Sequence, residues 1–391
     1  MGPLNLLVSQ DAAVGTAQAS TKRRTMKKVD SLILWLAAVL FTFTANLTSA
    51  ETGHLKFNIG VLLPLSGPLA EYGTAAKNGI DLAIKENPEL FRNMQFLYDD
   101  SRYDGNSSIS AFRKLQNNGD LSLLFVWGTT PSQVLAPIAE EAKIPMVALS
   151  TEPTLGARRH YVIRFCSHEG QQAEAILRYL RSQGVKRIGI LKTDIAFFSG
   201  VVTELKQRRR ADETLFVHDI SLAESDFRTL LTRMRNERVD GIGVLLVSGQ
   251  ISSFYRQLKQ LGMNTTTVGT DFFDSMTETT QAGGAMAGAV FPAHYVKSSF
   301  LKHYTEAYGN DTQFAVAAMT HDFALRTGAL FANSQSDLNA QKIIEIFKKA
   351  EKQEGTVTDF SWNDSPTRPG FDFRLIMRRI DEDRIIDIGP R

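Results

Sequence analysis

The sequence contains very little cysteine: Cys166 is the single cysteine among 391 residues. One thiol cannot form a disulfide within the chain, so burial of apolar side chains must supply the stability of the fold. Zinc sites usually combine several cysteines and histidines at short, regular spacings, and the seven histidines show no such pairing with one another or with Cys166. The sequence therefore predicts no metal site.

The common signatures of catalysis and of cofactor binding are also missing. The patterns HExxH, GxSxG, GxxxxGK and GxGxxG mark metallopeptidases, serine hydrolases, nucleotide-binding loops and dinucleotide-binding folds, and none of them occurs. We therefore expect no catalytic residues, no cofactor and no enzymatic activity. A periplasmic α/β hydrolase is an alternative, although the nucleophile and positioned base that it needs are not visible.

Long hydrophobic runs are absent except near the start of the chain. A basic start at residues 26–28 precedes an apolar run at residues 32–45, which is shorter than the roughly 20 residues that span a bilayer as a helix. Small residues then lead to Ala50, as before a signal-peptidase cleavage site. We therefore predict a leader over residues 1–50, with a signal peptide at residues 26–50 that is cleaved after Ala50, and a periplasmic location.

A strong charge of one sign is lacking as well. The formal net charge of +2 becomes −1 without residues 1–50, which carry five basic and two acidic residues. A nearly neutral mature chain gives no electrostatic reason to bind nucleic acid or an anionic membrane. No cysteine stands near Ala50 for lipid attachment, so we expect a freely diffusing monomer.

What the sequence does contain is a repeated alternation of buried strands and amphipathic helices. Residues 57–65, 94–100 and 121–128 are rich in Val, Leu, Ile and Phe, and a helical pattern follows each of them. This βαβ rhythm predicts a parallel sheet with helices on both faces. The rhythm restarts after residues 162–166, so we expect an α/β fold of two Rossmann-like lobes.

The order of the segments suggests how the two lobes share the chain. Residues 297–350 have helical patterns without strands and need a sheet to cover, while residues 371–389 have the pattern of a two-stranded hairpin. We predict an N-terminal lobe of residues 51–168 plus 297–350 and a C-terminal lobe of residues 169–296 plus 351–391. The chain would then cross between the lobes more than once, which makes a hinge.

Small hydroxyl residues follow the predicted strands of the first lobe, where each strand gives way to a helix. In an open parallel sheet, ligands bind beyond these strand ends, and free amides at a helix N-terminus attract an anion. The candidates for binding a carboxylate are Ser66, Thr129, Thr130, Ser132, Ser150 and Thr151. Serine and threonine also cap helices throughout proteins, so a purely structural role is the alternative for each.

The second lobe carries different chemistry at the equivalent strand ends. Phe197, Ser248 and Asp271 each follow a predicted strand. An acid opposite a carboxylate-binding rim would pair with an ammonium group, so the two rims together suit a zwitterion such as an amino acid. Asp271 could instead be the N-cap of the segment that begins at Phe272.

Four stretches, spread over about residues 54–389, match a known family in order and spacing: IGVLLPLSGPLAEYGTAAKNGIDLAI, LYDDSRYD, APIAEEAKIPMVALSTEP and YRQLKQLGM…VGTD. They resemble the leucine/isoleucine/valine-binding proteins, the type I periplasmic substrate-binding components of ABC importers. The resemblance implies two Rossmann-like lobes, joined by three crossings, that close over a small ligand and deliver it to an ABC permease. It also implies that Thr151 and a hydroxyl of residues 129–132 bind a carboxylate. Tyr72 and Phe197 would be aromatic contacts, and Asp271 would bind an ammonium group.

The sequence departs from that family within the predicted pocket. Phe197-Phe198 replaces the usual Tyr-Gly pair, and Ser248 stands where an aromatic residue is common. Both differences motivate the hypothesis that the ligand carries an apolar or aromatic side chain. Tyr72 would reach this ligand from the first loop, or alternatively pack in the core. An exported ligand sensor of the same fold is the alternative function.

Overall fold

The computed structural model describes residues 57–309, 313–332, 338–349, 355–382 and 384–389. The chain divides into two units, Met1–His54 and Leu55–Arg391, and every described residue belongs to the second. The predicted leader and its cleavage site therefore lie outside the described residues. Within the described part, no helix combines the length and the apolar character needed to cross a membrane.

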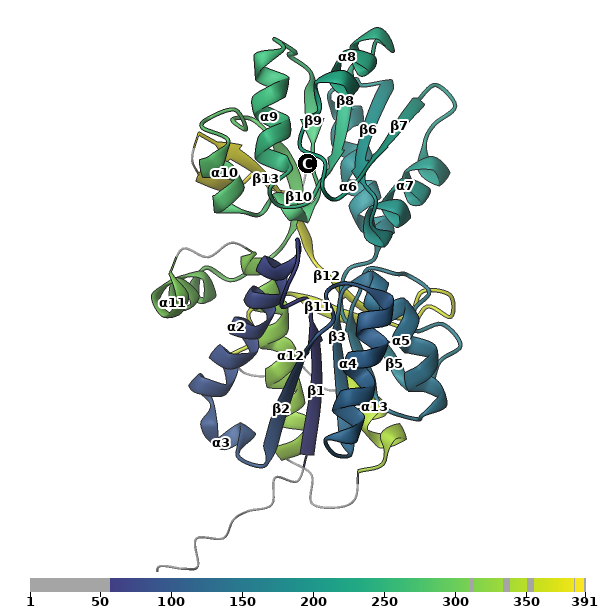
Figure 1. The fold of residues 1–391 in the computed structure, drawn as a ribbon, viewed down its shortest axis with the longest axis vertical. Coiled ribbons are helices and arrows are strands. Elements are labelled where there is room, and N and C mark those ends of the chain that lie inside the picture. The colour runs from purple at the N-terminus through teal and green to yellow at the C-terminus, as the bar shows by residue number, and fades with distance from the viewer. Residues whose placement is uncertain (1–56, 310–312, 333–337, 350–354, 383, 390–391) are drawn as a thin grey trace, which may run out of the picture. The chain divides into compact units, whose positions relative to one another are not determined.

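The first sheet has five parallel strands in the order β2-β1-β3-β4-β5 (Figure 1). The strands are β1 (Phe57–Leu63), β2 (Met94–Asp100), β3 (Leu121–Trp127), β4 (Met146–Leu149) and β5 (Val162–Arg164). The associated helices are α2 (Ala70–Glu86), α3 (Pro88–Phe91), α4 (Gly105–Asn117), α5 (Thr129–Glu141), α12 (Phe314–Ala332) and α13 (Ala340–Lys349). Ile59 and Val61 pack with α2 and α12, whereas Leu62 packs with α4 and α5. Both faces of the sheet are therefore covered, as the unbroken apolar strands predict.

The second sheet has seven strands in the order β14-β13-β10-β9-β8-β6-β7. Its parallel strands are β6 (Arg187–Thr193), β7 (Thr214–Ile220), β8 (Gly241–Leu245), β9 (Thr266–Val268) and β10 (Val290–His294). Two antiparallel strands, β13 (Leu375–Asp381) and β14 (Arg384–Asp387), extend it beyond β10. The associated helices are α6 (Glu169–Ser182), α7 (Ala196–Arg208), α8 (Arg228–Asn236), α9 (Ile251–Gln260) and α10 (Met276–Gln281). The predicted α/β fold with two sheet-based lobes is confirmed.

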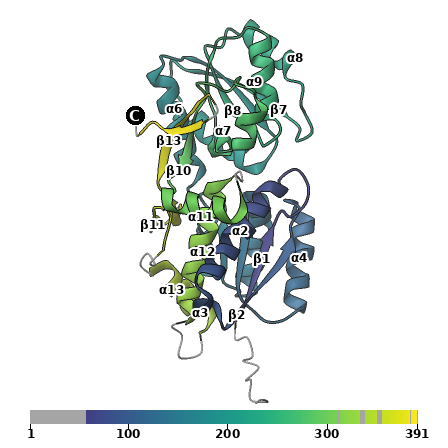
Figure 2. The same cartoon turned by 90° about the vertical axis from the view of Figure 1, so that its left-hand side faces the viewer.

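Helices from the later part of the chain pack on the first sheet. The helices α11 (Ser298–Tyr308) and α12 both contact α2, and Figure 2 shows α12 beside α2. On α12, the carboxylate of Asp322 accepts hydrogen bonds from the amides of Val357 and Thr358, each at 2.8 Å. These two bonds hold residues 357 and 358, which follow α13, against α12.

The end of the chain contains more strands than the single predicted hairpin. The pair β13–β14 is that hairpin, but β11 (Phe360–Asn363) and β12 (Gly370–Phe373) form a separate two-stranded sheet. Phe371 bridges to Phe165, directly after β5, and the Phe165 ring packs edge-on against Phe371 and Phe373. Residues 360–373 therefore pack beside β5 and do not extend the second sheet, whereas the sequence predicts residues 351–391 in the second lobe. The aromatic side chains of this segment pack against Phe165, and the sequence pattern does not show this long-range contact.

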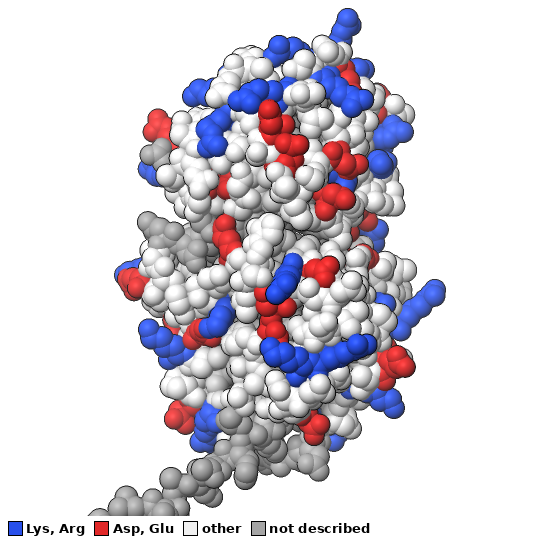
Figure 3. Space-filling view, viewed as in Figure 1, with Lys and Arg blue, Asp and Glu red and all other residues white. Residues whose placement is uncertain are grey.

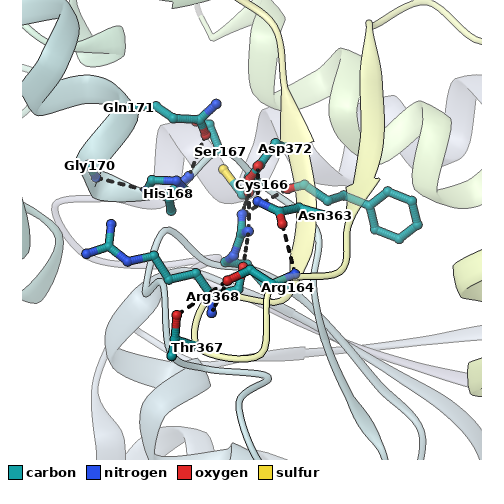
Figure 4. Close-up of polar contacts among 12 residues, drawn as sticks. Arg164, Cys166, Ser167, His168, Gly170, Gln171, Asn363, Thr367, Arg368 and Asp372 are labelled. Carbon is teal, nitrogen blue, oxygen red and sulfur yellow. Dashed lines mark hydrogen bonds and ion pairs between the residues drawn. The ribbon is translucent and has the colours of Figure 1, made fainter.

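Three connections join the two sheets: β5 to α6, β10 to α11, and β12 to β13. The Arg164 guanidinium, which is fully buried, binds the carbonyl of Phe371 at 2.9 Å and Asp372 Oδ1 at 2.9 Å (Figure 4). The third connection is tied in by the amide of Tyr295, which donates to the carbonyl of Arg374 at 2.9 Å. The three crossings that the resemblance implied are confirmed, and hydrogen bonds hold them together.

The surface carries charges of both signs. On the face shown in Figure 3, lysine and arginine side chains are interspersed with aspartate and glutamate side chains. Neither lobe presents a large area of a single charge on this face, which agrees with the nearly neutral charge calculated for residues 51–391.

Candidate functional site

A small cavity lies at the carboxyl ends of the strands and is lined from both sheets. Its volume is about 50 Å³, which accommodates a few water molecules or a small chemical group. Five of the ten predicted binding residues line it: Tyr72, Thr129, Thr151, Phe197 and Asp271. The cavity thus combines hydroxyls from the first sheet with an acid from the second.

The two threonines meet because their strands pair in register. Trp127, at the end of β3, pairs with Leu149, at the end of β4, so the loops after these strands start side by side. Thr129 Oγ1 lies 3.0 Å from Thr151 Oγ1, and it also accepts a hydrogen bond from the Thr151 amide at 3.4 Å. This hydroxyl pair is the polar floor of the cavity on the side of the first sheet.

The other five predicted residues do not line the cavity, because their side chains bond elsewhere. Ser66 donates to Asp100 at 2.5 Å, and Ser132 donates to the carbonyl of Gly128 within α5 at 2.6 Å. Ser150 accepts from the amide of Glu152 at 3.3 Å. For Ser132 and Ser150 these local bonds are a structural role, the alternative to ligand binding, although neither bond caps a helix.

Thr130 and Ser248 also have protein partners. The Thr130 hydroxyl faces the phenol of Tyr103, and Ser248 Oγ lies 2.8 Å from Glu71 Oε2 and 3.1 Å from Glu278 Oε1. Glu71 belongs to α2, on the first sheet, so Ser248 forms a contact between the two lobes.

Five aromatic side chains line the cavity. Phe272 stacks with Phe197 at a ring-centroid distance of 5.5 Å and approaches Tyr72 at 4.8 Å. Trp127 lies 5.6 Å from Tyr72 and 5.7 Å from Tyr103. Sequence reasoning missed Trp127, Tyr103 and Phe272; for Trp127, its position at the end of a buried strand was the available signal. This wall suits an apolar or aromatic group.

Tyr103 is placed over the start of α5 by an unusual backbone. Arg102 and Tyr103 have φ values of 49° and 55°, and Gly128 has a φ of 96°. A Cβ at Gly128 would overlap the Tyr103 ring, so only glycine fits there. Burial raises the pKa of Tyr103 to about 12, whereas hydrogen bonds with Thr130 and with the amide of Thr129 lower it. The phenol therefore faces the helix N-terminus, where an anion would be favoured.

Four buried polar atoms in the cavity wall have no hydrogen-bond partner among the described residues. They are Tyr72 Oη, Trp127 Nε1, Asp271 Oδ1 and His294 Nδ1. A buried polar atom without a partner costs free energy, and such atoms are rare unless they serve a function. The set includes an obligatory donor, Trp127, and a carboxylate acceptor, Asp271. A ligand with both an acceptor and a donor group would satisfy them.

Asp271 and His294 form a weakly charged pair on the side of the second sheet. Burial, followed by the nearby charge of Asp274, raises the pKa of Asp271 to about 7. Burial, followed by the charge of Arg378, lowers the pKa of His294 to about 4, so this imidazole is neutral at pH 7. His294 Nε2 bonds Ser167 Oγ at 2.8 Å, and its Nδ1 lies 3.5 Å from Asp271 Oδ2.

Asp271 is not the N-cap of the following segment. It is the first residue of a short 3₁₀ helix, η1 (Asp271–Phe273), and Thr270 caps this helix by accepting from the amide of Phe272 at 3.4 Å. The capping alternative for Asp271 is therefore wrong, and its carboxylate remains available to the cavity.

The next feature is the arrangement of possible metal ligands in the described residues. Across the described ranges, no group of three or more His, Cys, Asp and Glu side chains could hold a metal ion. Cys166 lines the cavity, and burial raises the pKa of its thiol to about 12, so it is not a reactive thiolate at neutral pH.

Known proteins match most of this chain. A family model described as periplasmic binding protein matches residues 56–361. A Leu/Ile/Val-binding protein of Rhizobium johnstonii is 30% identical over 248 residues, which is 60% of this chain and 67% of the relative. The chain is thus similar to binding proteins over much of both lobes.

Two solved structures share the fold. A leucine-binding protein from Thermotoga maritima has a TM-score of 0.73 at 20% identity, covering 85% of this chain and 98% of that one. A solute-binding protein of an ABC transporter from R. palustris, in complex with benzoate, has a TM-score of 0.73 at 17% identity, covering 85% and 95%. At these identities the likeness establishes the fold.

Proposed function

The chain belongs to the periplasmic binding protein family, and from this premise we propose that it is the substrate-binding component of an ABC importer. Its ligand is a small carboxylate with an apolar or aromatic side chain, and an amino acid is the first candidate. The protein captures this ligand without chemical change and presents it to a permease in the membrane. The observation that carries the proposal is the cavity, with its paired hydroxyls on one side and Asp271 on the other.

Each polar group of the proposed ligand would bind to one side of the cavity. Thr129, the first residue of α5, and Thr151, which follows β4, form the hydroxyl pair that would receive a carboxylate. Asp271 Oδ1, which has no protein partner, is the acceptor for an ammonium group. The aromatic wall of Tyr72, Trp127 and Phe272 then surrounds the apolar part.

Capture takes place by closure of the two lobes around the ligand. The cavity's lining residues come from both sheets, so a ligand that touches both sides binds the closed conformation more tightly and shifts the population towards it. The contact between Ser248 and Glu71 forms across the lobes in that conformation. A cavity of about 50 Å³ is smaller than a whole amino acid, so Phe272 or the lobes must shift for the ligand to enter.

An aromatic carboxylate without an ammonium group is the second candidate. The observation that favours it is the raised pKa of Asp271, about 7, because the protonated carboxyl can donate a hydrogen bond to a hydroxyl or a carboxylate. The benzoate complex of the R. palustris protein gives a precedent on the same fold.

Titration calorimetry on residues 51–391 tests the proposal and separates the two candidates. The panel is L-leucine, L-phenylalanine, benzoate and 4-hydroxybenzoate, with D-ribose and sulfate as controls. We expect one of the four carboxylates to bind and both controls to fail. Binding of only ribose or sulfate would contradict the proposal.

The variant Asp271→Asn then identifies the ligand class. Charge-assisted hydrogen bonds contribute about 1.5–3 kcal/mol, so the variant should weaken an amino acid roughly 10- to 100-fold. Benzoate binding should change less than about threefold. Equal losses for both ligands would show that Asp271 does not recognise the ammonium group.

The partner and the location follow from the family and rest on the same proposal. Export through the predicted signal peptide would place the mature chain in the periplasm as a monomer, where it meets the permease. Fractionation of expressing cells, with size-exclusion chromatography of the exported protein, tests both points: cytoplasmic retention or a stable dimer would contradict them.

A further inference from the structure

Glu169 is a buried acid that touches the carboxylate-binding floor of the cavity. It is the first residue of α6, and only 4% of its surface is exposed. Its Oε1 lies 3.2 Å from Thr151 Oγ1, and its amide donates to the carbonyl of Thr151 at 3.1 Å. Thr151 in turn contacts Thr129, so three side chains form one chain of hydrogen bonds that ends at the cavity.

The proton on Glu169 sets the direction of this chain. A protonated Glu169 donates to Thr151, Thr151 donates to Thr129, and the Thr129 proton is free to point into the cavity. An ionised Glu169 can only accept, so the Thr151 proton turns away from the cavity and the Thr129 proton follows it. The ligand's carboxylate would then face oxygen lone pairs and a nearby negative charge, both of which repel it.

The surroundings of Glu169 favour the protonated form. Burial contributes most, and the charges of Glu152, after β4, and Glu204, on α7, act in the same direction, whereas Thr151 and Arg164 oppose them. Together they raise the pKa of Glu169 to about 9. Gly200 on α7 adds a steric constraint, because a Cβ there would overlap the Glu169 carboxyl.

We propose that Glu169 is a positioning residue for the ligand's carboxylate: it donates its proton to Thr151 and thereby turns the Thr129 hydroxyl towards the ligand. This inference rests on the proposed function, since it needs a carboxylate ligand at Thr129 and Thr151. Binding of the ligand's carboxylate therefore requires the proton on Glu169.

This role predicts how affinity depends on pH. Glu169 keeps its proton up to about pH 9. Above that value only the remaining protonated fraction binds the carboxylate well, so affinity falls about tenfold for each pH unit. Asp271 acts below pH 7, where an ammonium ligand displaces its proton. The interval from pH 8 to pH 10 therefore tests Glu169 separately.

Calorimetry at pH 8 and pH 10 with L-leucine, L-phenylalanine and benzoate measures this dependence. Benzoate does not change its charge in this interval. We expect the wild type to lose about tenfold more affinity than Glu169→Gln between the two pH values. At pH 8, Glu169→Gln, whose amide can still donate to Thr151, should bind within about threefold of the wild type.

Glu174→Gln is the matched control, because Glu174 lies on the same helix and its carboxylate pairs with Arg178 at 3.9 Å, away from Thr151. It should keep the tenfold pH effect. An unchanged pH effect in Glu169→Gln would overturn the proposal, even with full ligand affinity. Gly200→Ala should weaken binding at least tenfold by displacing the Glu169 carboxyl, and it should do so much less in a Glu169→Ala background; equal effects in both backgrounds would also count against the proposal.

A measurement without ligand keeps the inference separate from the proposed function. If the wild type binds none of the three carboxylates, the proposed function fails, and the Glu169 titration is then read directly. Carbon-13 NMR of carboxyl-labelled glutamate, with Glu169→Gln to assign the signal, should show ionisation above pH 8. Ionisation below pH 6 would overturn the positioning role.

Discussion

At the scale of single residues, the second side of the cavity is set by Asp271 and its neighbours. Burial raises the pKa of Asp271 to about 7 and lowers that of His294 to about 4. At pH 6 both side chains are therefore mostly neutral. Under the proposed function, an arriving ammonium group would ionise Asp271, and the attraction between the two charges would offset the cost of burying this acid.

This burial predicts a pH-dependent cost in stability. The pKa of Asp271 is higher in the folded state, about 7, than the ordinary 3.8, so the unfolded chain binds fewer protons and the wild type loses stability as pH rises from 4 to 7. Asp271→Asn removes this loss. In thermal unfolding without ligand, the Tm advantage of the variant should grow by at least about 2 °C from pH 4.5 to pH 8, the shift that roughly 1 kcal/mol produces.

Glu89→Gln is the control for that experiment, since the Glu89 side chain is 88% exposed. Its Tm difference from the wild type should stay constant over the same pH interval. A constant difference for Asp271→Asn as well would show that Asp271 is not destabilised by burial.

The sequence located the strand ends but not the direction of each side chain. Thr129 and Ser132 both lie in the first turn of α5. Thr129 lines the cavity, whereas Ser132 donates a hydrogen bond back to the carbonyl of Gly128. A serine three residues into a helix can always make such a local bond, and residue type alone does not separate the two outcomes. Trp127 and His294 were missed because an apolar strand predicts burial and does not show which buried side chain borders a cavity.

At the scale of elements, α2 and α12 approach each other closely in the first lobe. A Cβ at Gly79 would overlap the carbonyl of Ala317 and the hydroxyl of Thr320 on α12. The backbone of α2 can approach α12 this closely only because Gly79 lacks a side chain. The glycine at position 79 therefore sets how closely the two helices pack, and with it how α12 covers the sheet.

Gly79→Ala should therefore destabilise the protein, although alanine favours a helix by about 1 kcal/mol over glycine. We expect the Tm to fall by at least about 4 °C in thermal unfolding. Gly328→Ala, on α12, is the matched control, because its nearest neighbours are the flexible side chain of Leu90 and the ring of Phe91. A Tm loss at Gly79 no larger than at Gly328 would contradict the close contact.

Most strands could be predicted, and the exceptions have physical reasons. The runs predicted at residues 57–65, 94–100 and 121–128 became β1, β2 and β3, and the bounds of β2 match, because buried parallel strands are continuous apolar or β-branched segments. The strand β10 was missed since Pro292, which cannot donate a ladder hydrogen bond, interrupts the pattern. The strands β11 and β12 are four residues each, and their pairing depends on the distant Phe165.

At the scale of the whole described unit, two sheets share one hinge. Arg164, at the end of β5, binds Phe371 and Asp372 of β12 just before the crossing to β13, so it ties the first connection to the third (Figure 4). Ser248 with Glu71 and Tyr72 with Phe272 are contacts between the two lobes at the cavity. Under the proposed function, a ligand that adds contacts across the cavity would stabilise the closed arrangement, and a permease would recognise that arrangement.

The most direct test of this account is a crystal structure of residues 51–391 with the carboxylate that binds most tightly in the panel. The account predicts the ligand's carboxylate within hydrogen-bond distance of Thr129 and Thr151, its apolar part against Trp127 and Phe272, and both lobes in contact with it. A ligand bound to one lobe alone, or at a site that Thr151 and Asp271 do not reach, would contradict it.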